Sequence, residues 1–242
     1  MRNASLPSFR FITRGLLPFV AAVSASCAAT PTNGPGATGG QIGDTNLGDV
    51  VNFVSGTGDL PYALGDNVYG MSGNAFLSRS TLGNSSLVIG TDPGKICIHG
   101  TVDAVPTPPD GSHPPYSSYW GIEVGFDLNL GLAWMPGSVV GFSFTIEGTV
   151  MSPVRFMALP FGLDPTAEAS AKCLPMNPQS NVAQQVQFTQ LTQFCWDTAS
   201  LVIDTSKGLS NFGLQIAATT NAAIPFDWCL KDLRPILAAK SP

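Results

Sequence analysis

Charged residues are scarce in this chain, and their scarcity excludes one class of partner. Lys, Arg, Asp and Glu make up 11% of the 242 residues, whereas soluble domains usually carry roughly 25%. The net charge is -5, and no run of like charges occurs. Because phosphate binding needs clustered Lys and Arg, we do not expect nucleic acid as a partner.

Histidines and catalytic motifs are also sparse. His99 and His113 are the only histidines, so a Ser-His-Asp triad or a multi-histidine zinc site has almost no raw material. The sequence contains no Gly-x-Ser-x-Gly elbow, and its cysteines lack the CxxC-like spacing of zinc sites. No motif in the chain therefore specifies a chemical reaction.

Helical periodicity is missing, and short alternating runs separated by turns take its place. The chain has 26 Gly and 20 Pro, which suits many strands joined by turns. The clearest run covers residues 119–129, where apolar residues alternate with small or acidic ones. Its apolar members are Trp120, Ile122, Val124, Phe126 and Leu128. Such alternation is typical of a strand with one face in a core.

Similar runs along the chain predict an all-β sandwich. Further strands are expected at residues 75–79, 86–90, 95–102, 139–148, 154–159, 182–194, 209–216 and 225–236. Residues 106–115 are expected to form a loop, because their prolines lack the donors that a sheet needs. A second Pro-rich loop is expected around Cys173. Residues 49–67 are ambiguous between a first strand and a loosely packed arm.

The first 27 residues have the pattern of an export signal. Arginines precede a short apolar stretch at residues 16–23, and small residues follow up to Cys27. The apolar stretch is too short to span a bilayer as a mature helix. The segment resembles a bacterial lipoprotein signal, which implies lipidation of Cys27 after cleavage, although Ser24 stands where that family usually has Leu. Plain secretion is the alternative.

The rest of the chain divides into a linker and one domain. Residues 28–48 are rich in Gly, Pro, Thr and Ala and lack the apolar surface that would offset ordering entropy. We therefore expect a flexible linker there and a single sandwich domain at residues 49–238. The expected protein is a monomer at the outer cell surface or in the periplasm, lipid-anchored, or secreted.

Cysteine usage agrees with export. Besides Cys27, the chain has Cys97, Cys173, Cys195 and Cys229. An even set in an exported protein predicts two disulfides, with three possible connectivities.

The order and faces of the later strands resemble a known superfold. The run from Trp120 to the closing segment at residues 226–233 is similar to jelly-roll modules of the galactose-binding-like superfold. Many carbohydrate-binding modules of secreted bacterial glycoside hydrolases have this form. The resemblance covers roughly residues 69–237. It implies a jelly-roll sandwich that binds carbohydrate without catalysis.

The resemblance has consequences for the closing strand. If that strand lies beside an early strand, Cys229 meets Cys97, and Cys173 is left to pair with Cys195. The family also carries paired acids near this end, which often contribute to a structural calcium site. Here Lys231 and Asp232 stand in their place, so the resemblance implies only Asp232 as a calcium ligand. A salt bridge from Asp232 to Arg234 or to a neighbouring Arg is an equally good interpretation.

Aromatic and polar residues near strand ends provide candidate sugar contacts. Flat rings suit stacking on saccharide faces at small entropic cost, and carboxylates can bind hydroxyl groups. The expected binding residues are Tyr116, Tyr119, Trp134, Glu123 and Asp127. Core packing is the alternative for the aromatic residues, and it is favoured for Trp120 and Trp228 because these lie within strands.

Two other functions remain open at this point. A sandwich-fold glycoside hydrolase requires Glu123 or Glu147 to face another carboxylate across a cleft, about 5–10 Å away. A structural or protein-interaction module requires no sugar site at all. Convergence of Tyr116, Tyr119 and Trp134 on one accessible face would favour carbohydrate binding over the latter.

Overall fold

The computed structural model shows a protein built from β-strands. It describes residues 46–55, 62–80, 85–90, 94–112, 114–116, 118–149, 154–163, 171–193, 195, 203–220 and 222–239. Within these ranges the other regular structure is three short 3₁₀ turns, so the all-β prediction is confirmed. None of the helices in this part of the chain is long and apolar enough to cross a membrane. The predicted signal, its Cys27 and most of the predicted linker lie outside the described residues.

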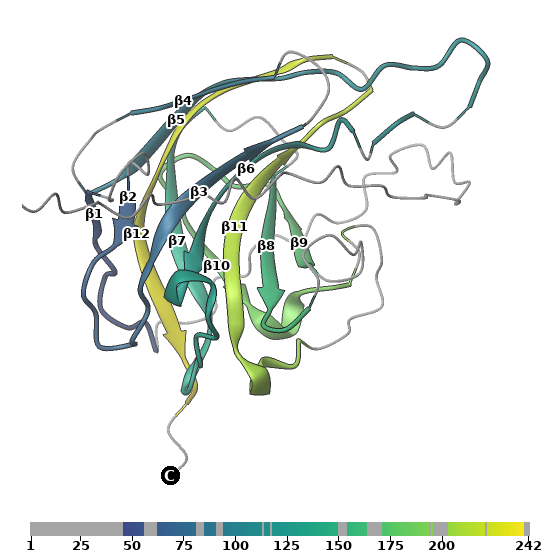
Figure 1. Ribbon diagram of the computed structural model, residues 1–242. Helices are drawn as coiled ribbons and strands as arrows, with labels where there is room; N and C mark the ends of the chain where they lie inside the picture. Colours follow the sequence, from purple (N-terminus) through teal and green to yellow (C-terminus); the bar gives the residue numbers. More distant parts are fainter. Residues whose placement is uncertain are drawn as a thin grey trace, which may run out of the picture.

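Two antiparallel sheets form the sandwich (Figure 1). The larger sheet has the order β1 (Phe53–Ser55), β2 (Tyr62–Leu64), β3 (Gly73–Arg79), β6 (Gly121–Leu128), β11 (Leu209–Ala217), β8 (Val154–Pro160) and β9 (Lys172–Met176). The smaller sheet has the order β10 (Ala183–Gln187), β7 (Val139–Thr149), β12 (Ile224–Leu237), β5 (Ile96–Val102) and β4 (Ser86–Ile89). From β5 to β8, and again from β9 to β12, each strand lies in the sheet opposite its predecessor. This crossing connectivity is that of a jelly-roll sandwich.

The core lies between the sheets and follows from the alternation of side chains along each strand. On β6 the four inward residues are Ile122, Val124, Phe126 and Leu128, all buried. They pack within a cluster of aromatic rings in which Phe142 of β7, from the opposite sheet, and Phe212 of β11, from the same sheet, stack with centroids 4.6 Å apart. Because every second residue of β6 is apolar, the other residues are presented on the outer face of the sheet.

Both implied disulfides are confirmed. Cys97 and Cys229 are directly opposite each other in the register of β5 and β12 and are bonded across the two strands. Cys173 of β9 is bonded to Cys195. The closing strand therefore does lie beside an early strand, as the resemblance implied.

Three local predictions differ from the structure. β9 occupies the region expected to be a loop around Cys173, and its Pro175 is tolerated because β9 is an edge strand. The strand expected at residues 182–194 ends at Gln187, where a 3₁₀ turn begins. The chain also joins the sandwich inside the predicted linker, since Leu47 bridges to Ile236 of β12.

Candidate functional site

Three rows of side chains cross the outer face of the larger sheet, on β3, β6, β11 and β8. Each row joins residues that are direct partners in the strand register and point away from the core. The polar row is Ser78, Glu123, Gln215 and Arg155. The glycine row is Phe76, Gly125, Gly213 and Met157. The amide row is Asn74, Asp127 and Asn211, followed by Leu159. We call these rows together the outer-face site.

Gly125 and Gly213, which we call the glycine floor, lie side by side in the middle of the site, and side chains of neighbouring strands cover them. A Cβ atom at Gly125 would lie 2.7 Å from the ring of Phe76, and one at Gly213 would lie 2.9 Å from Oε1 of Glu123. The Phe76 ring and the Glu123 carboxyl thus reach over the two glycines from neighbouring strands. Glycine allows both groups to approach the backbone this closely.

The polar row carries an acid and a base that do not pair with each other. Nη1 of Arg155 donates a hydrogen bond to Oε1 of Gln215 at 3.1 Å. Gln215 is buried and separates Arg155 from Glu123, because β11 lies between β8 and β6. In the described part of the chain both ion pairs are made by Glu147, on the other sheet. The row therefore presents an acid and a guanidinium, each without a counter-charge in that part.

Burial changes the electrostatics of this site. Burial is the main cause that raises the pKa of Glu123 to about 7, and the negative charge of Asp127 adds to it. The pKa of Asp127 is also raised by partial burial of its carboxyl, although its side chain is more exposed. Burial lowers the pKa of Arg155, while the Tyr116 phenol acts in the opposite direction. Both charged forms in the polar row are thus poorly solvated.

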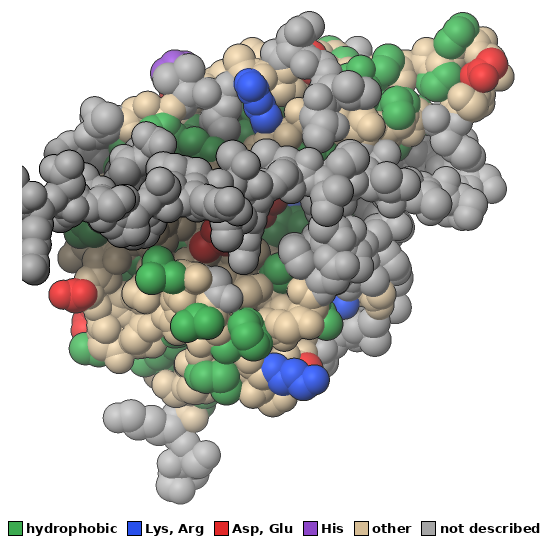
Figure 2. All heavy atoms as spheres, viewed as in Figure 1, with side chains coloured by type: hydrophobic (Ala, Val, Ile, Leu, Met, Phe, Trp, Pro, Cys, Tyr) green, Lys and Arg blue, Asp and Glu red, His purple; other side chains and the backbone are tan. Residues whose placement is uncertain are grey.

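The amide row ends in a depression of about 300 Å³. It is lined by Asp127, Leu159, Phe161, Gly162, Leu163, Ser210 and Asn211. Figure 2, drawn from the same side as Figure 1, shows a few acidic atoms near the middle of the view. The outer-face site therefore continues from the polar row, across the glycine floor, into a depression lined by both apolar and polar groups.

Some of the expected binding residues lie at the outer-face site, and one of them lies in the core instead. Glu123 and Asp127 lie on the same face of β6, four residues apart. Tyr116 is 46% exposed and close enough to Arg155 to influence its charge. Tyr119 is partly buried against the core.

The prediction that Trp134 contacts a ligand is wrong. Its side chain is 1% exposed and stacks on Phe142 in the core, with centroids 6.0 Å apart. Its Nε1 donates to the carbonyl oxygen of Tyr69 at 2.9 Å, so its polar atom is satisfied inside the fold. Trp134 is held there by a bridge to Leu209 of β11. Trp134, which lies outside the expected strands, is thus placed in the core by its pairing with a residue distant in sequence.

The site also contains residues that the sequence analysis did not single out. These are Phe76, Gln215, Arg155, Asn211 and the two glycines of the floor. A signal was available for Arg155, which is the only charged residue of β8 and alternates with buried neighbours. The pairing of Gly125 with Gly213 had no local signal, because it depends on the register of β6 and β11.

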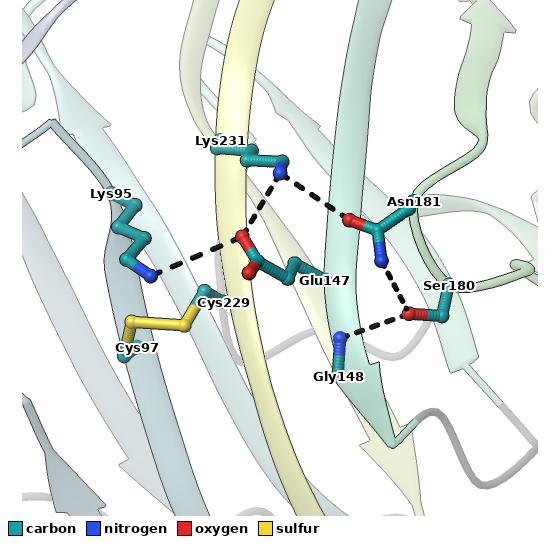
Figure 3. Close-up of polar contacts among 8 residues, drawn as sticks. All are labelled: Lys95, Cys97, Glu147, Gly148, Ser180, Asn181, Cys229 and Lys231. Atoms are coloured by element: carbon teal, nitrogen blue, oxygen red, sulfur yellow. Dashed lines mark hydrogen bonds and ion pairs between the residues drawn. A yellow bond between two sulfur atoms is a disulfide. The ribbon is translucent and has the colours of Figure 1, made fainter.

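Glu147 does not face Glu123. It lies on the outer face of the smaller sheet, where Nζ of Lys231 is 2.9 Å and Nζ of Lys95 is 3.9 Å from its Oε2 (Figure 3). Asn181 accepts a further bond from Lys231 at 3.3 Å. The hydrogen bond between Lys231 and Glu147 is the main cause that lowers the pKa of Glu147. This network stabilises the charged form of Glu147 and does not form the carboxylate pair of a hydrolase.

Asp232 lies where the register of β12 and β7 shifts, exposed and with a φ of 55°. The ion pairs found among the described residues do not include one with Arg234. Within the described ranges, no three His, Cys, Asp or Glu side chains come together as a metal site. Calcium needs several oxygen ligands, so the described side chains around Asp232 do not fit such a site.

The raised pKa of Glu123 predicts an unusual dependence of stability on pH. The folded protein binds the Glu123 proton more tightly than the unfolded chain, whose value is near 4.5. Its contribution is therefore most favourable below pH 4.5, falls as the pH rises to about 7, and is level above. Between pH 4.5 and 7.5, we expect the free energy of unfolding of Glu123→Gln to fall by up to about 3 kcal/mol less than that of wild type. Urea unfolding at the two pH values measures the difference.

Glu147→Gln provides a control of opposite sign. The lowered pKa of Glu147 stabilises the fold above its ordinary value and is lost as the pH falls. Its removal should leave the fall in stability between pH 4.5 and 7.5 almost unchanged and should reduce the loss of stability below pH 4.5. An identical pH dependence in wild type and Glu123→Gln would contradict a raised pKa at Glu123.

Comparison with known proteins gives only distant matches. No protein-family model and no curated protein matches the chain. Among solved structures, a family 11 carbohydrate-binding module from Clostridium thermocellum, in complex with a β-1,3-1,4-mixed-linked tetrasaccharide, is 10% identical. It covers 80% of this chain and 99% of its own, with a TM-score of 0.43. The family 11 module of a cellulosomal cellulase from the same organism is 13% identical, covering 83% and 93%, with a TM-score of 0.38. An agarase is 12% identical over 67% of this chain and 24% of its own, with a TM-score of 0.41.

Proposed function

We propose that the outer-face site binds a carbohydrate chain and that the protein is a non-catalytic binding module. The observation that carries this proposal is the glycine floor between Phe76 and Met157, with rows of hydrogen-bonding side chains on both sides. The Phe76 ring and the Glu123 carboxyl lie over this floor, so a sugar ring on this face would meet an aromatic ring beside a polar group. The flanking apolar groups offer contact area, and the two rows offer partners for hydroxyl groups.

The chemistry of the three rows suits saccharides. A sugar ring has apolar C–H faces and polar hydroxyl edges, and an aromatic ring such as Phe76 can stack on the face. Asn211 carries both a donor and an acceptor, so it can bind hydroxyl groups of either orientation. Asp127 adds an acceptor at the depression. This combination favours a polyhydroxylated ligand over a purely apolar one.

The two outer faces of the sandwich separate Glu147 from Glu123. Glycosidases hold their two carboxyl groups about 5–10 Å apart across the scissile bond. Glu147 lies on the outer face of the smaller sheet, where it binds Lys231, whereas Glu123 lies on the outer face of the larger sheet. These two acids therefore do not form the carboxyl pair of a glycosidase.

Export and a lipid anchor are further parts of the proposal. Two disulfides are typical of proteins that mature in an oxidising compartment. Lipidation at Cys27 would then hold the module at a membrane surface through the segment that follows. Calcium at Asp232 forms no part of the proposal, because the described side chains do not supply its ligands.

The proposal predicts that Phe76→Ala weakens glycan binding. Loss of ring stacking is expected to lower affinity roughly ten-fold, about 1.4 kcal/mol. The measurement is titration calorimetry of the full chain, with disulfides formed, against ligands found in a polysaccharide panel. Leu77→Ala is the matched control, because Leu77 is the next residue of β3, points to the opposite face and is 40% exposed.

Equal affinity in wild type and Phe76→Ala, with Leu77→Ala also unchanged, would place binding elsewhere. Silence of a verified folded protein across the whole panel would remove the proposed function.

A protein-interaction module is the second candidate, and one observation favours it. Leu130, Leu132, Met135 and Leu163 are 77%, 67%, 56% and 44% exposed. They lie in segments joined at one end of the sandwich, where Phe161 bonds to Gly208 and Trp134 to Leu209. Figure 2 shows hydrophobic side chains gathered in the lower part of the view. An exposed apolar patch of this kind often marks a protein contact.

A further inference from the structure

We propose that the outer-face site selects acidic saccharides, and that Arg155 binds their anionic group, a uronate carboxylate or a sulfate ester. This inference rests on the proposed function and names its ligand class. It concerns Arg155, which no expectation from the sequence placed in a site.

Arg155 is a cation without a counter-ion in the described structure. Its hydrogen-bond partner there is the neutral side chain of Gln215, at 3.1 Å. An arginine carries five N–H donors, and most of those of Arg155 have no partner among the described residues. The guanidinium is partly buried, and its lowered pKa has desolvation as the main cause. A poorly solvated charge is costly unless it is paired, and a bound anion would supply that pairing.

The geometry of a guanidinium determines which anion it prefers. Its planar fork matches the oxygen atoms of a carboxylate or sulfate, and such charge-assisted bonds are about twice as strong as neutral ones. The bond to Gln215 holds one edge of the fork within the polar row. The Tyr116 phenol lies close enough to influence the charge of Arg155, so a ring from the loop before β6 lies near the guanidinium.

The position of Glu123 leaves room for an anion at Arg155. The strands β8, β11 and β6 are neighbours, and neighbouring strands are about 4.8 Å apart. The Cα atoms of Arg155 and Glu123 are therefore about 10 Å apart in one row, with Gln215 between them. A saccharide ring over Gln215 would place an acidic substituent at Arg155 and hydroxyl groups toward Glu123. The raised pKa of Glu123 also reduces its repulsion of an acidic ligand near neutral pH.

A purely structural role for Arg155 is the competing explanation. In that case Arg155 only orients Gln215, and its replacement would lower stability without changing the preference between neutral and acidic ligands. The two explanations therefore differ in ligand selectivity, which can be measured independently of stability.

The test uses polysaccharides matched in backbone and different in charge. Glucan, glucuronan and glucan sulfate form one set, and galactan, galacturonan and galactan sulfate form another. Wild-type full chain is expected to bind an acidic member at least ten-fold more tightly than its neutral counterpart, with affinity that falls as salt rises. Preference for the uronate or for the sulfate identifies which anion is the ligand.

Arg155→Gln is expected to lower affinity for the acidic polymer by 10- to 100-fold and to change affinity for the neutral one less than two-fold. Arg79→Gln removes the same charge from β3, on the opposite face, and should leave both unchanged. Arg155→Lys keeps the charge but loses the fork, and an intermediate loss is expected. If Arg155→Gln does not fold, two measurements still test the inference. They are the affinities of Arg155→Lys and the preference of wild type for acidic over neutral polymers.

Two results would overturn the inference in different ways. In the first, wild type binds a neutral polymer as tightly as its acidic counterpart, and the Arg155 variants have the same affinities. This result would refute selection by charge and leave carbohydrate binding intact. Failure of the folded wild type to bind any member of either set would refute the proposed function itself, and this inference with it.

Discussion

Replacing both Cys97 and Cys229 with Ala is expected to lower the free energy of unfolding by about 4–5 kcal/mol. The bond joins residues 132 apart in sequence, and the chain-entropy model assigns about 5 kcal/mol to a loop of that length. The bond also ties β5 to β12 within the smaller sheet. Urea unfolding of the oxidised protein and the double variant measures the difference.

The second disulfide provides the matched control. Cys173 and Cys195 are 22 residues apart, for which the same model gives about 3 kcal/mol. The corresponding double change to Ala should therefore cost less than the loss of the long-range bond. A larger cost for the short loop would show that loop entropy does not dominate the stabilisation by these bonds.

Replacing Trp134 with Ala is expected to destabilise the fold by about 3–5 kcal/mol, the usual range for a buried aromatic residue. The ring is fully buried against Phe142, and its Nε1 binds the carbonyl oxygen of Tyr69. Trp134→Phe keeps most of the packing and removes that bond, so a loss of about 1–3 kcal/mol is expected. Thermal and urea unfolding of the three proteins give the comparison.

Glycan binding by the Trp134 variants separates the core role from the ligand role expected from the sequence. Below the unfolding transition, Trp134→Phe should bind as well as wild type, because the ring lies away from the outer-face site. A variant that stays fully stable but loses binding would restore the original expectation.

Sequence alternation was a reliable guide wherever one face of a strand met the core. Ile122, Val124 and Phe126 were placed correctly because period-two patterning depends only on neighbouring residues. It failed at Pro175, where a proline suggested a loop and the edge position of β9 removed the conflict. It also failed at Trp134, whose burial depends on Leu209, a partner 75 positions further along the chain.

The residues of the candidate site likewise fall into those that local alternation specifies and those that depend on strand pairing. Glu123 and Asp127 were found because they share the outward face of one strand, which alternation alone specifies. Arg155, Gln215 and Phe76 were missed because each comes from a different strand. They meet only through the registers of β3, β6, β11 and β8.

By itself, the sequence determined the all-β class, the outward position of Glu123 and Asp127, and the presence of an even set of cysteines besides Cys27. These properties follow from composition and from contacts between near neighbours in the chain. The tertiary structure alone decided that Gly125 meets Gly213, that Arg155 has a neutral partner and that Trp134 lies in the core. Each of these depends on which strands become neighbours and in what register, and that is determined by packing of the two sheets as a whole.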